Sequence, residues 1–250
     1  MFLVGGQSNA DGRVASSLGP SYLHDNIVDG VQVWNSTDIV PYNLLSTGQS
    51  GRGSSWVTGG SSGNYAFCHV GLKEIADDLN NVTVVQVSEG DSCMALGPQA
   101  RGSWNANYAS IPAGTPKLLE ALEDRVADFV ANQSLGVSVV FRGYIFHQGE
   151  SDAVSPRDTD YAANWAAHVA QVRSFTRPDL PVFYGTIPTA NTSDFNINVY
   201  NAQMNFAASD PHAYCRDNSA LTLFDPFHFD AASCDTFGSW VANTYKANYG

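Results

Sequence analysis

The sequence predicts an α/β protein in which a mostly parallel sheet is covered by helices on both faces. Short apolar runs rich in β-branched residues alternate along the 250 residues with segments whose apolar positions recur every three or four residues. Strands that alternate with helices at this spacing build parallel sheets with helices packed on either side. No linker interrupts the alternation, so we expect a single domain over residues 1–250.

Five apolar runs predict the strands. The first, Met1 to Val4, is stopped by two glycines, and the clearest later one, Val82 to Val87, is β-branched at most positions. The expected strands are residues 1–4, 31–34, 82–87, 137–146 and 181–186, with a further extended segment at 221–224. Residues 35–63 are rich in Gly, Ser and Thr without periodicity, and we expect a functional loop region there.

Helical spacing is clearest between Lys117 and Asn132, where Leu118, Leu122 and Val126 repeat on one face. The expected helices are residues 64–80, 117–132, 160–176, 198–208 and 234–248. Each follows a predicted strand or extended segment, as βαβ units require.

The chain is acidic, with 24 Asp and Glu against 12 Lys and Arg, a net charge of −12 and a pI of about 4.6. Nucleic acids and anionic membrane surfaces are bound mainly through Lys and Arg. The charge therefore argues against both kinds of partner. The sequence also lacks an apolar stretch of about 20 residues, the length a membrane-spanning helix needs.

The four cysteines, together with few lysines and abundant Ser, Asn and Thr, favour an extracellular, cell-surface or virion-associated protein. Because the chain begins within its first predicted strand, we expect a mature or excised domain. The sequence therefore gives no information about an export signal. We expect a Cys215–Cys234 disulfide, which would staple the loop carrying His228, with free buried thiols as the alternative. The cysteine spacing fits no metal site.

Ser8 directly follows the glycines that end the first predicted strand. Open α/β sheets place their chemistry where parallel strands end, and a serine there becomes a nucleophile when an imidazole takes its proton. Asp225 and His228, three residues apart, can converge on one side of a loop, as a Ser-His-Asp triad requires. A structural turn with an incidental histidine is the alternative for this pair.

Three motifs occur in the order Gly6-Gln7-Ser8-Asn9, His147-Gln148-Gly149-Glu150-Ser151-Asp152 and Asp225-Pro226-Phe227-His228. Together they resemble the SGNH hydrolase superfamily, and specifically its sialate O-acetylesterase-like branch, which includes the acetyl xylan esterases of carbohydrate esterase family six. The resemblance covers nearly the whole chain. It implies a three-layer α/β/α sandwich with a flavodoxin-like five-stranded sheet, and removal of acetyl groups from carbohydrate hydroxyls without a metal or other cofactor.

Carried over by position, the resemblance makes Ser8 the nucleophile, His228 the base and Asp225 the residue that orients His228. For the oxyanion hole it implies the backbone N–H groups of Ser8 and Gly63 and the side-chain amide of Gln148. Gly59 and Gly60 are rivals of Gly63, because the local match there is loose.

Glu150 is expected to be a buried carboxylate that supports the site together with Gln7 and Asn9; a second catalytic acid is the alternative for Glu150. We expect His147 to be a packed histidine at a strand end rather than a catalytic base. Arg13, Ser92 and Trp104 are candidates for contact with the sugar, and surface packing explains Arg13 and Trp104 equally well.

Two competing patterns carry less weight. Gly90-Asp91-Ser92 matches the nucleophile motif of the wider superfamily, but it follows a later strand than the first, so we expect Ser92 to line the pocket instead. A metal cluster is the other pattern, and the spacing of its members fits no helical or hairpin ligand set. Those members are His212, Asp225, His228 and Asp230.

The sequence therefore predicts a serine esterase that removes acetyl groups from an O-acetylated poly- or oligosaccharide through an acetyl-enzyme. One alternative is a non-catalytic carbohydrate-binding or adhesin module of a larger surface or phage tail protein. Another is a lipase- or thioesterase-like relative, which would need an apolar acyl groove where this chain has polar loops. The sugar, the acetylated position and the oligomeric state stay open.

Overall fold

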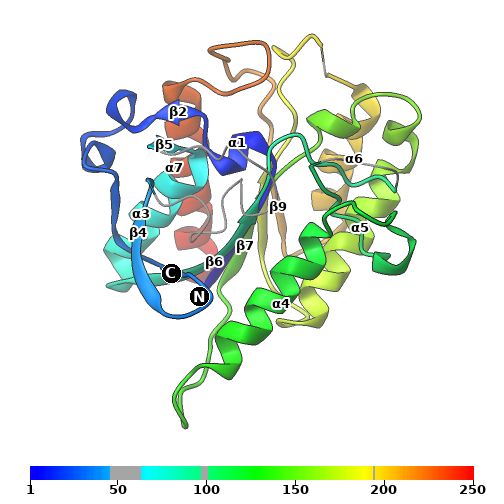
Figure 1. Ribbon diagram of the computed structural model, residues 1–250. Coiled ribbons are helices and arrows are strands. Elements are labelled where there is room, and N and C mark those ends of the chain that lie inside the picture. Colours follow the sequence, from blue (N-terminus) through cyan, green and yellow to red (C-terminus); the bar gives the residue numbers. More distant parts are fainter. Residues whose placement is uncertain (46–62, 97–100, 194) are drawn as a thin grey trace.

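A computed structural model describes residues 1–45, 63–96, 101–193 and 195–250, and its centre is a seven-stranded sheet (Figure 1). The strand order is β4-β3-β6-β1-β7-β8-β9. All neighbours pair in parallel except β3 and β4, which are antiparallel. The strands are β1 (Phe2–Gly6), β3 (Ile27–Trp34), β4 (Ile39–Asn43), β6 (Val82–Ser88), β7 (Gly143–His147), β8 (Val182–Gly185) and β9 (Ala213–Arg216), and a second sheet pairs β2 (Val14–Ala15) with β5 (Asn64–Tyr65).

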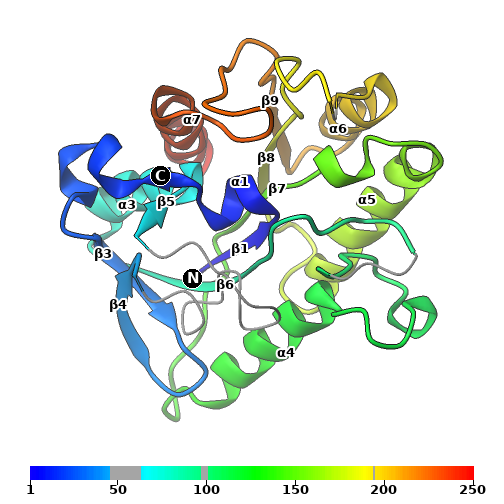
Figure 2. The same ribbon diagram turned by 45° about the horizontal axis from the view of Figure 1, so that its top comes forward.

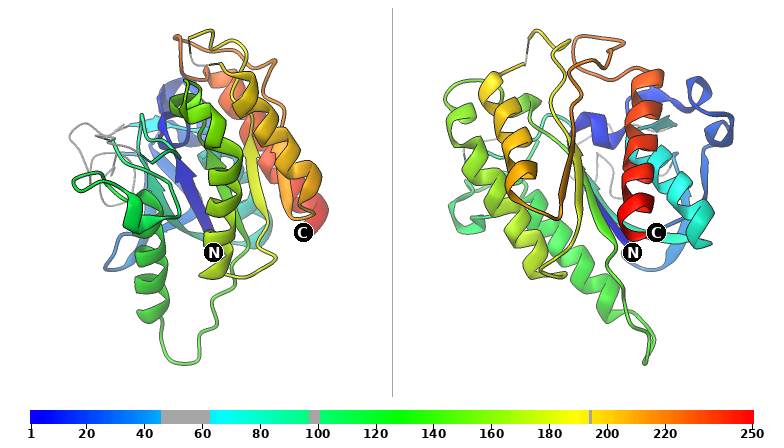
Figure 3. Two further views of the ribbon diagram at one scale, coloured as in Figure 1. Left: turned by 90° about the vertical axis from the view of Figure 1, so that its right-hand side faces the viewer. Right: turned by 180° about the vertical axis from the view of Figure 1, so that it is seen from behind.

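Helices cover both faces of the large sheet, which makes three layers (Figure 3). Helices α3 (Phe67–Leu79) and α7 (Ala231–Tyr249) pack on one face. Helices α4 (Leu118–Ala131), α5 (Arg157–Ser174) and α6 (Ile197–Ser209) pack on the other. Short helical turns are α1 (Ser8–Asp11), η1 (Ser16–Leu18), η2 (Ser21–Leu23), η3 (Tyr108–Ser110) and η4 (Glu150–Asp152).

The central strand β1 is buried on both sides, which explains its uninterrupted apolar sequence. Side chains alternate across a strand, and accordingly Phe2 and Val4 pack in the core under α3 and α7, while Leu3 packs in the core under α4, α5 and α6. All three are fully buried.

β1 lies in the middle of the sheet, with β6, β3 and β4 on one side and β7, β8 and β9 on the other. β6 and β7 flank β1, and Gly6 at its end is in register with Ser88 on one side and His147 on the other. The loops that follow these three strands therefore meet at one end of the sheet, where α/β proteins of this kind bind ligands. Figure 2 looks onto this end and shows α1 near its centre.

The expected α/β class and mostly parallel sheet are confirmed, and the five expected helices are present with shifted ends. The expected five strands are too few. β4 lies in the segment expected to be a loop and contains Pro41, which an edge strand tolerates because one side of its backbone is unpaired. β9 also lies at an edge and was not expected. The strand expected at 137–146 begins only at Gly143, and Val137 and Val140 are exposed.

The expected Cys215–Cys234 disulfide is wrong, since all four cysteines are free thiols. Cys215 lies in β9, and Cys234 is buried in the first turn of α7. Burial raises the pKa of the Cys215 thiol to about 12, so this sulfur stays protonated at neutral pH. No helix in the described part of the chain is long and apolar enough to cross a membrane.

Candidate active site

Ser8 is held at the end of β1 by a turn that leaves no room for a side chain at Gly6. Gly6 has a φ of +131°, and a Cβ atom there would lie 2.2 Å from the carbonyl oxygen of His147. The Gln7 N–H donates to that same oxygen (3.0 Å), so the chain turns directly from the strand into α1. Ser8 is the first residue of α1, and the helix does not use the N–H of this position.

The loop before α7 places His228 against Asp225. His228 Nδ1 donates to Asp225 Oδ2 (2.7 Å), and Asp225 Oδ1 accepts the backbone N–H groups of Phe227 and His228 (2.8 Å each). Burial acts to raise the pKa of Asp225, but the hydrogen bonds from His228 and from the two backbone groups outweigh it and hold the pKa below its ordinary value. Asp225 is therefore ionised at neutral pH and fixes the orientation of the imidazole.

Asn9 joins this histidine loop to the turn that carries Ser8. Its Nδ2 donates to the carbonyl oxygen of Phe227 (3.1 Å) and to Glu150 Oε1 (2.8 Å), and its Oδ1 accepts the N–H of Phe229 (3.0 Å). Residues about 220 positions apart in the sequence are thereby held side by side.

Replacing Asn9 by alanine should lower the free energy of unfolding by about 2–4 kcal/mol, because buried partners lose their hydrogen bonds. The rate of ester hydrolysis should fall as well, since the histidine loop loses its attachment beside Ser8. Urea unfolding followed by circular dichroism measures the first effect. Asn132→Ala is the matched control, because Asn132 is exposed at the end of α4. This variant should lose no more than about 0.5 kcal/mol of the free energy of unfolding. Equal losses in the two variants would contradict the role given to Asn9.

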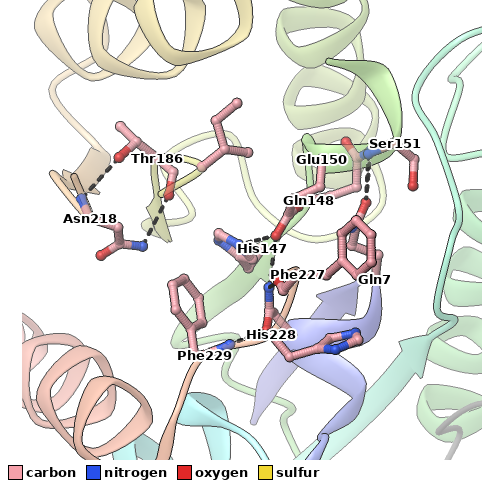
Figure 4. A network of polar contacts seen from close by, with 12 residues as sticks. Gln7, His147, Gln148, Glu150, Ser151, Thr186, Asn218, Phe227, His228 and Phe229 are labelled. Atoms are coloured by element: carbon pink, nitrogen blue, oxygen red, sulfur yellow. Dashed lines mark hydrogen bonds and ion pairs between the residues drawn. The ribbon is translucent and has the colours of Figure 1, made fainter. Parts of the chain in front are cut away.

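Glu150 is a buried residue whose hydrogen bonds connect three segments of the chain around the site. Its Oε1 accepts from His147 Nε2 (2.9 Å) as well as from Asn9, and Figure 4 shows it between His147 and the 227–229 segment. Burial acts to raise the pKa of Glu150, but His147 and the hydrogen bonds to the carboxylate hold it below its ordinary value. These are the contacts of a residue that positions loops.

Gln148 does not line the cavity beside Ser8. Its Nε2 donates to Asp152 Oδ2 (2.6 Å), the carbonyl oxygen of Ser92 (3.2 Å) and Gln7 Oε1 (3.2 Å), all buried. To donate to an oxyanion, the Gln148 amide would have to give up its hydrogen bond to one of these acceptors. In the arrangement observed, Gln148 supports Gln7, which also accepts the N–H of Ser151 (3.5 Å; Figure 4).

Ser8 and His228 line one cavity of about 350 Å³ at the end of the sheet. Most of its lining residues have polar or ionisable side chains. Its walls are formed by Gln7, Ser8, Asp11, Arg13, Glu89, Gly90, Asp91, Arg101, Glu150, Ser151, Phe227 and His228. Ser8 and His228 thus reach this cavity from opposite ends of the chain.

Gly63 is not an oxyanion donor in this structure, because its N–H donates to the carbonyl oxygen of Leu44 (2.9 Å) beside β5. Its rivals Gly59 and Gly60 lie outside the described residues. Gly90, which follows β6, lines the cavity instead, and a Cβ on Gly90 would lie 3.5 Å from that of Ser8. Gly90 reaches the cavity because it follows the strand that pairs with β1, and neighbouring strands cannot be identified from spacing along the sequence.

Ser92 and Trp104 are also placed differently from expectation. Both are fully buried, and Trp104 Nε1 donates to Ser92 Oγ (2.9 Å), which in turn donates to the carbonyl oxygen of Glu89 (2.7 Å). Neither side chain can reach a sugar in the cavity. Of the expected sugar contacts only Arg13 lines the cavity, where its Nη1 pairs with Asp11 Oδ2 (2.5 Å).

Glu89, Asp11 and Arg101 were not singled out in the sequence, although they line the cavity. Asp11 stands one turn after Ser8, which is the only local signal that could have pointed to it. In the portion of the chain that the structure describes, no three His, Cys, Asp or Glu side chains are grouped to hold a metal ion.

Comparisons with known proteins identify the family of the chain. A family model described as carbohydrate esterase, sialic acid-specific acetylesterase, matches residues 1–247. A search of curated proteins found no match.

Similar solved structures include a protein from Arabidopsis thaliana (TM-score 0.72, 18% identity, covering 100% of this chain and 98% of that one). They also include NanS (TM-score 0.65, 15% identity, 99% and 98%) and a carbohydrate acetylesterase from Xanthomonas citri (TM-score 0.61, 15% identity, 96% and 54%). At these identities the likeness concerns the fold. The family match over nearly the whole chain confirms the resemblance inferred from the three motifs: the chain belongs to the sialic acid-specific acetylesterase family of carbohydrate esterases, and it is a carboxylic ester hydrolase of the carbohydrate acetylesterase type.

Proposed function

We propose that the chain hydrolyses acetyl esters of a poly- or oligosaccharide with Ser8 as nucleophile, His228 as general base and Asp225 as the group that orients His228. The observation that carries the proposal is that Ser8 and His228 line one cavity, while His228 Nδ1 is engaged by Asp225 at 2.7 Å. With Nδ1 engaged, Nε2 is the ring nitrogen left to take the serine proton.

In the proposed reaction, Ser8 Oγ attacks the acetyl carbonyl carbon as its proton passes to His228. The tetrahedral intermediate collapses when the sugar oxygen leaves with that proton, and an acetyl-Ser8 ester remains. His228 then takes a proton from water, which attacks the acetyl group and releases acetate and free Ser8.

The oxyanion of both intermediates needs donors that are already in place, because each such donor contributes roughly 10²–10³ in rate. We assign this role to the backbone N–H of Ser8, at the start of α1, and to the backbone N–H of Gly90 in place of Gly63. Gly90 suits it because it lines the cavity together with Ser8, while the space that a side chain on Gly90 would need is taken by Arg13, whose Nη2 lies 2.4 Å from the Cβ position. Gln148 is a third donor only if its amide leaves one of its buried acceptors.

An O-acetylated carbohydrate suits the cavity because its walls present carboxylates, guanidinium groups and amides to hydroxyl groups. An aliphatic acyl chain would find Phe227 as the one large apolar side chain among the described lining residues. We include in the proposal two expectations from the sequence. The first is acetyl xylan esterase activity, and the second is an extracellular location.

Covalent labelling tests the identity of the nucleophile. A fluorophosphonate probe should react with the native protein at Ser8, because only a serine with an adjacent base attacks such a phosphorus centre at a useful rate. Peptide mass spectrometry should locate the adduct on the peptide that contains residues 7–13. Labelling of Ser92, or no labelling of a folded protein, would contradict the assignment.

A further inference from the structure

One wall of the cavity carries a carboxyl group that the proposed hydrolysis does not use. Glu89 follows β6 directly, and its backbone N–H donates to the carbonyl oxygen of Gly6 (3.0 Å), which fixes it beside the turn that carries Ser8. The residue is only 3% exposed, yet it lines the same cavity as Ser8.

The two oxygens of Glu89 differ in their surroundings. Oε1 faces Arg101 Nη1 at 3.5 Å. Oε2 is buried and has no hydrogen-bond partner among the described residues. A buried carboxylate oxygen without a donor has lost its water without replacement. Because Oε2 is shielded from solvent while the residue lines the cavity, a rotation of the Glu89 side chain when a sugar binds would let Oε2 accept a hydroxyl group of that sugar.

The charges around the cavity disfavour an anionic ligand. Four carboxylates line it against two guanidinium groups, and each guanidinium already faces one of those carboxylates. The carboxylates are Asp11, Glu89, Asp91 and Glu150, and the guanidinium groups are Arg13 and Arg101. A ligand carboxylate would meet an excess of negative charge, whereas a neutral hydroxyl would not.

We propose that Glu89 Oε2 accepts a hydrogen bond from a hydroxyl group close to the acetylated position of the sugar, and that Glu89 thereby selects uncharged over anionic O-acetylated sugars. This rests on the proposed function, because the ester at Ser8 is what places the sugar against Glu89. The expected preference differs from the anionic sialic acid that the family's description names.

The test compares two substrates in each variant. The sugar substrate is a mono-O-acetylated methyl β-xyloside, and the reference is 4-nitrophenyl acetate, which has no sugar hydroxyl. Glu89→Gln keeps the shape of the side chain but removes its charge, and it should lower the ratio of kcat/KM for the xyloside to kcat/KM for the reference by about tenfold, the size expected for a hydrogen bond to a charged group.

Asp91→Asn is the matched control, because it removes one negative charge from the same cavity at an exposed position whose left-handed backbone (φ +60°) suits asparagine. It should change the ratio by less than about twofold. Equal changes in both variants would show a general effect of charge and would overturn the hydrogen bond.

The unmodified protein provides a second test that does not depend on the folding of a variant. Burial, and next the neighbouring Asp11, raises the pKa of Glu89 to about 7, although Arg101 and Arg13 act to lower it. The ionised carboxylate is the stronger acceptor, so the substrate ratio should fall as the pH is lowered from about 8 to about 6. A change of ionisation that acts on the ester reaction itself affects both substrates and cancels in the ratio, and Glu89→Gln should abolish this pH dependence.

Substrate charge provides the third arm. N-acetyl-9-O-acetylneuraminic acid should be hydrolysed more slowly than the acetylated xyloside, and Glu89→Gln should narrow that difference. A wild-type preference for the acetylated neuraminic acid, or a substrate ratio that Glu89→Gln leaves unchanged, overturns the inference about Glu89 alone. Absence of hydrolysis of 4-nitrophenyl acetate by the folded wild-type protein would instead overturn the proposed function.

Discussion

Replacing Ser8 by alanine is expected to lower kcat for 4-nitrophenyl acetate by roughly 10⁴-fold or more, because the hydroxyl group that forms the proposed acetyl-enzyme is lost. The fold should survive, since only one oxygen atom is lost and the turn at Gly6 and the Asn9 contacts do not involve it. Release of 4-nitrophenol, followed at 400 nm or thereabouts, measures the rate, and thermal unfolding checks the fold.

Ser151→Ala is the matched control, because Ser151 is a second serine on the cavity wall. Its hydroxyl donates to Asp91 Oδ1 (3.4 Å) and has no role in the proposed reaction. This variant should retain activity within about threefold, as expected of a partly exposed position away from special features. Appreciable hydrolysis of 4-nitrophenyl acetate by the folded Ser8→Ala variant would exclude Ser8 as the nucleophile.

Replacing Asp225 by asparagine is expected to lower kcat by about 10³–10⁴-fold, since an amide can hold the imidazole in the wrong tautomer and cannot stabilise the imidazolium. The side-chain oxygen of asparagine can still accept the backbone N–H groups of Phe227 and His228, so the loop should keep its conformation. The loss should therefore fall on kcat, with KM little changed.

Asp217→Asn is the matched control for this loss. Asp217 also accepts a backbone N–H, that of Ser219 (2.8 Å), and hydrogen bonds likewise hold its pKa below the ordinary value against the effect of burial, but it does not line the cavity. This variant should keep nearly full activity. A comparable loss in both variants would mean that loop stability, rather than orientation of His228, explains the effect at Asp225.

Because the pKa of Asp225 lies below its ordinary value, its carboxylate stays ionised as the pH falls through the range in which a free aspartate takes up a proton. The acid limit of activity should accordingly be set by protonation of other groups before Asp225.

The central strands and the helices could be predicted because each carries its own signal. β1 is buried on both faces and reads as a continuous apolar run, and α4 shows apolar residues at helical spacing. The edge strands β4 and β9 lack such a signal, since they are only partly buried. Their extended form depends on pairing with β3 and β8, which no local pattern records.

The same distinction separates the residues that line the cavity from those that were expected near it and lie elsewhere. Gly63, Ser92 and Trp104 were assigned by their position along the chain, and packing places Ser92 and Trp104 in the core and commits the Gly63 N–H to Leu44. Glu89 and Gly90 reach the cavity because β6 pairs with β1. The expected Cys215–Cys234 pair failed for a related reason, since proximity in sequence does not bring two sulfur atoms together.

By itself, the sequence determined the α/β class and the family and supplied the residues of the proposed triad, because these depend on local periodicity and on short motifs whose members are close along the chain. Only the tertiary structure decided which groups surround Ser8: the order of the strands brings the ends of β1, β6 and β7 together, and Asn9 attaches the histidine loop to them. The physical reason is that the walls of the cavity are set by strand pairing and burial between distant segments, and those energies belong to the folded chain as a whole.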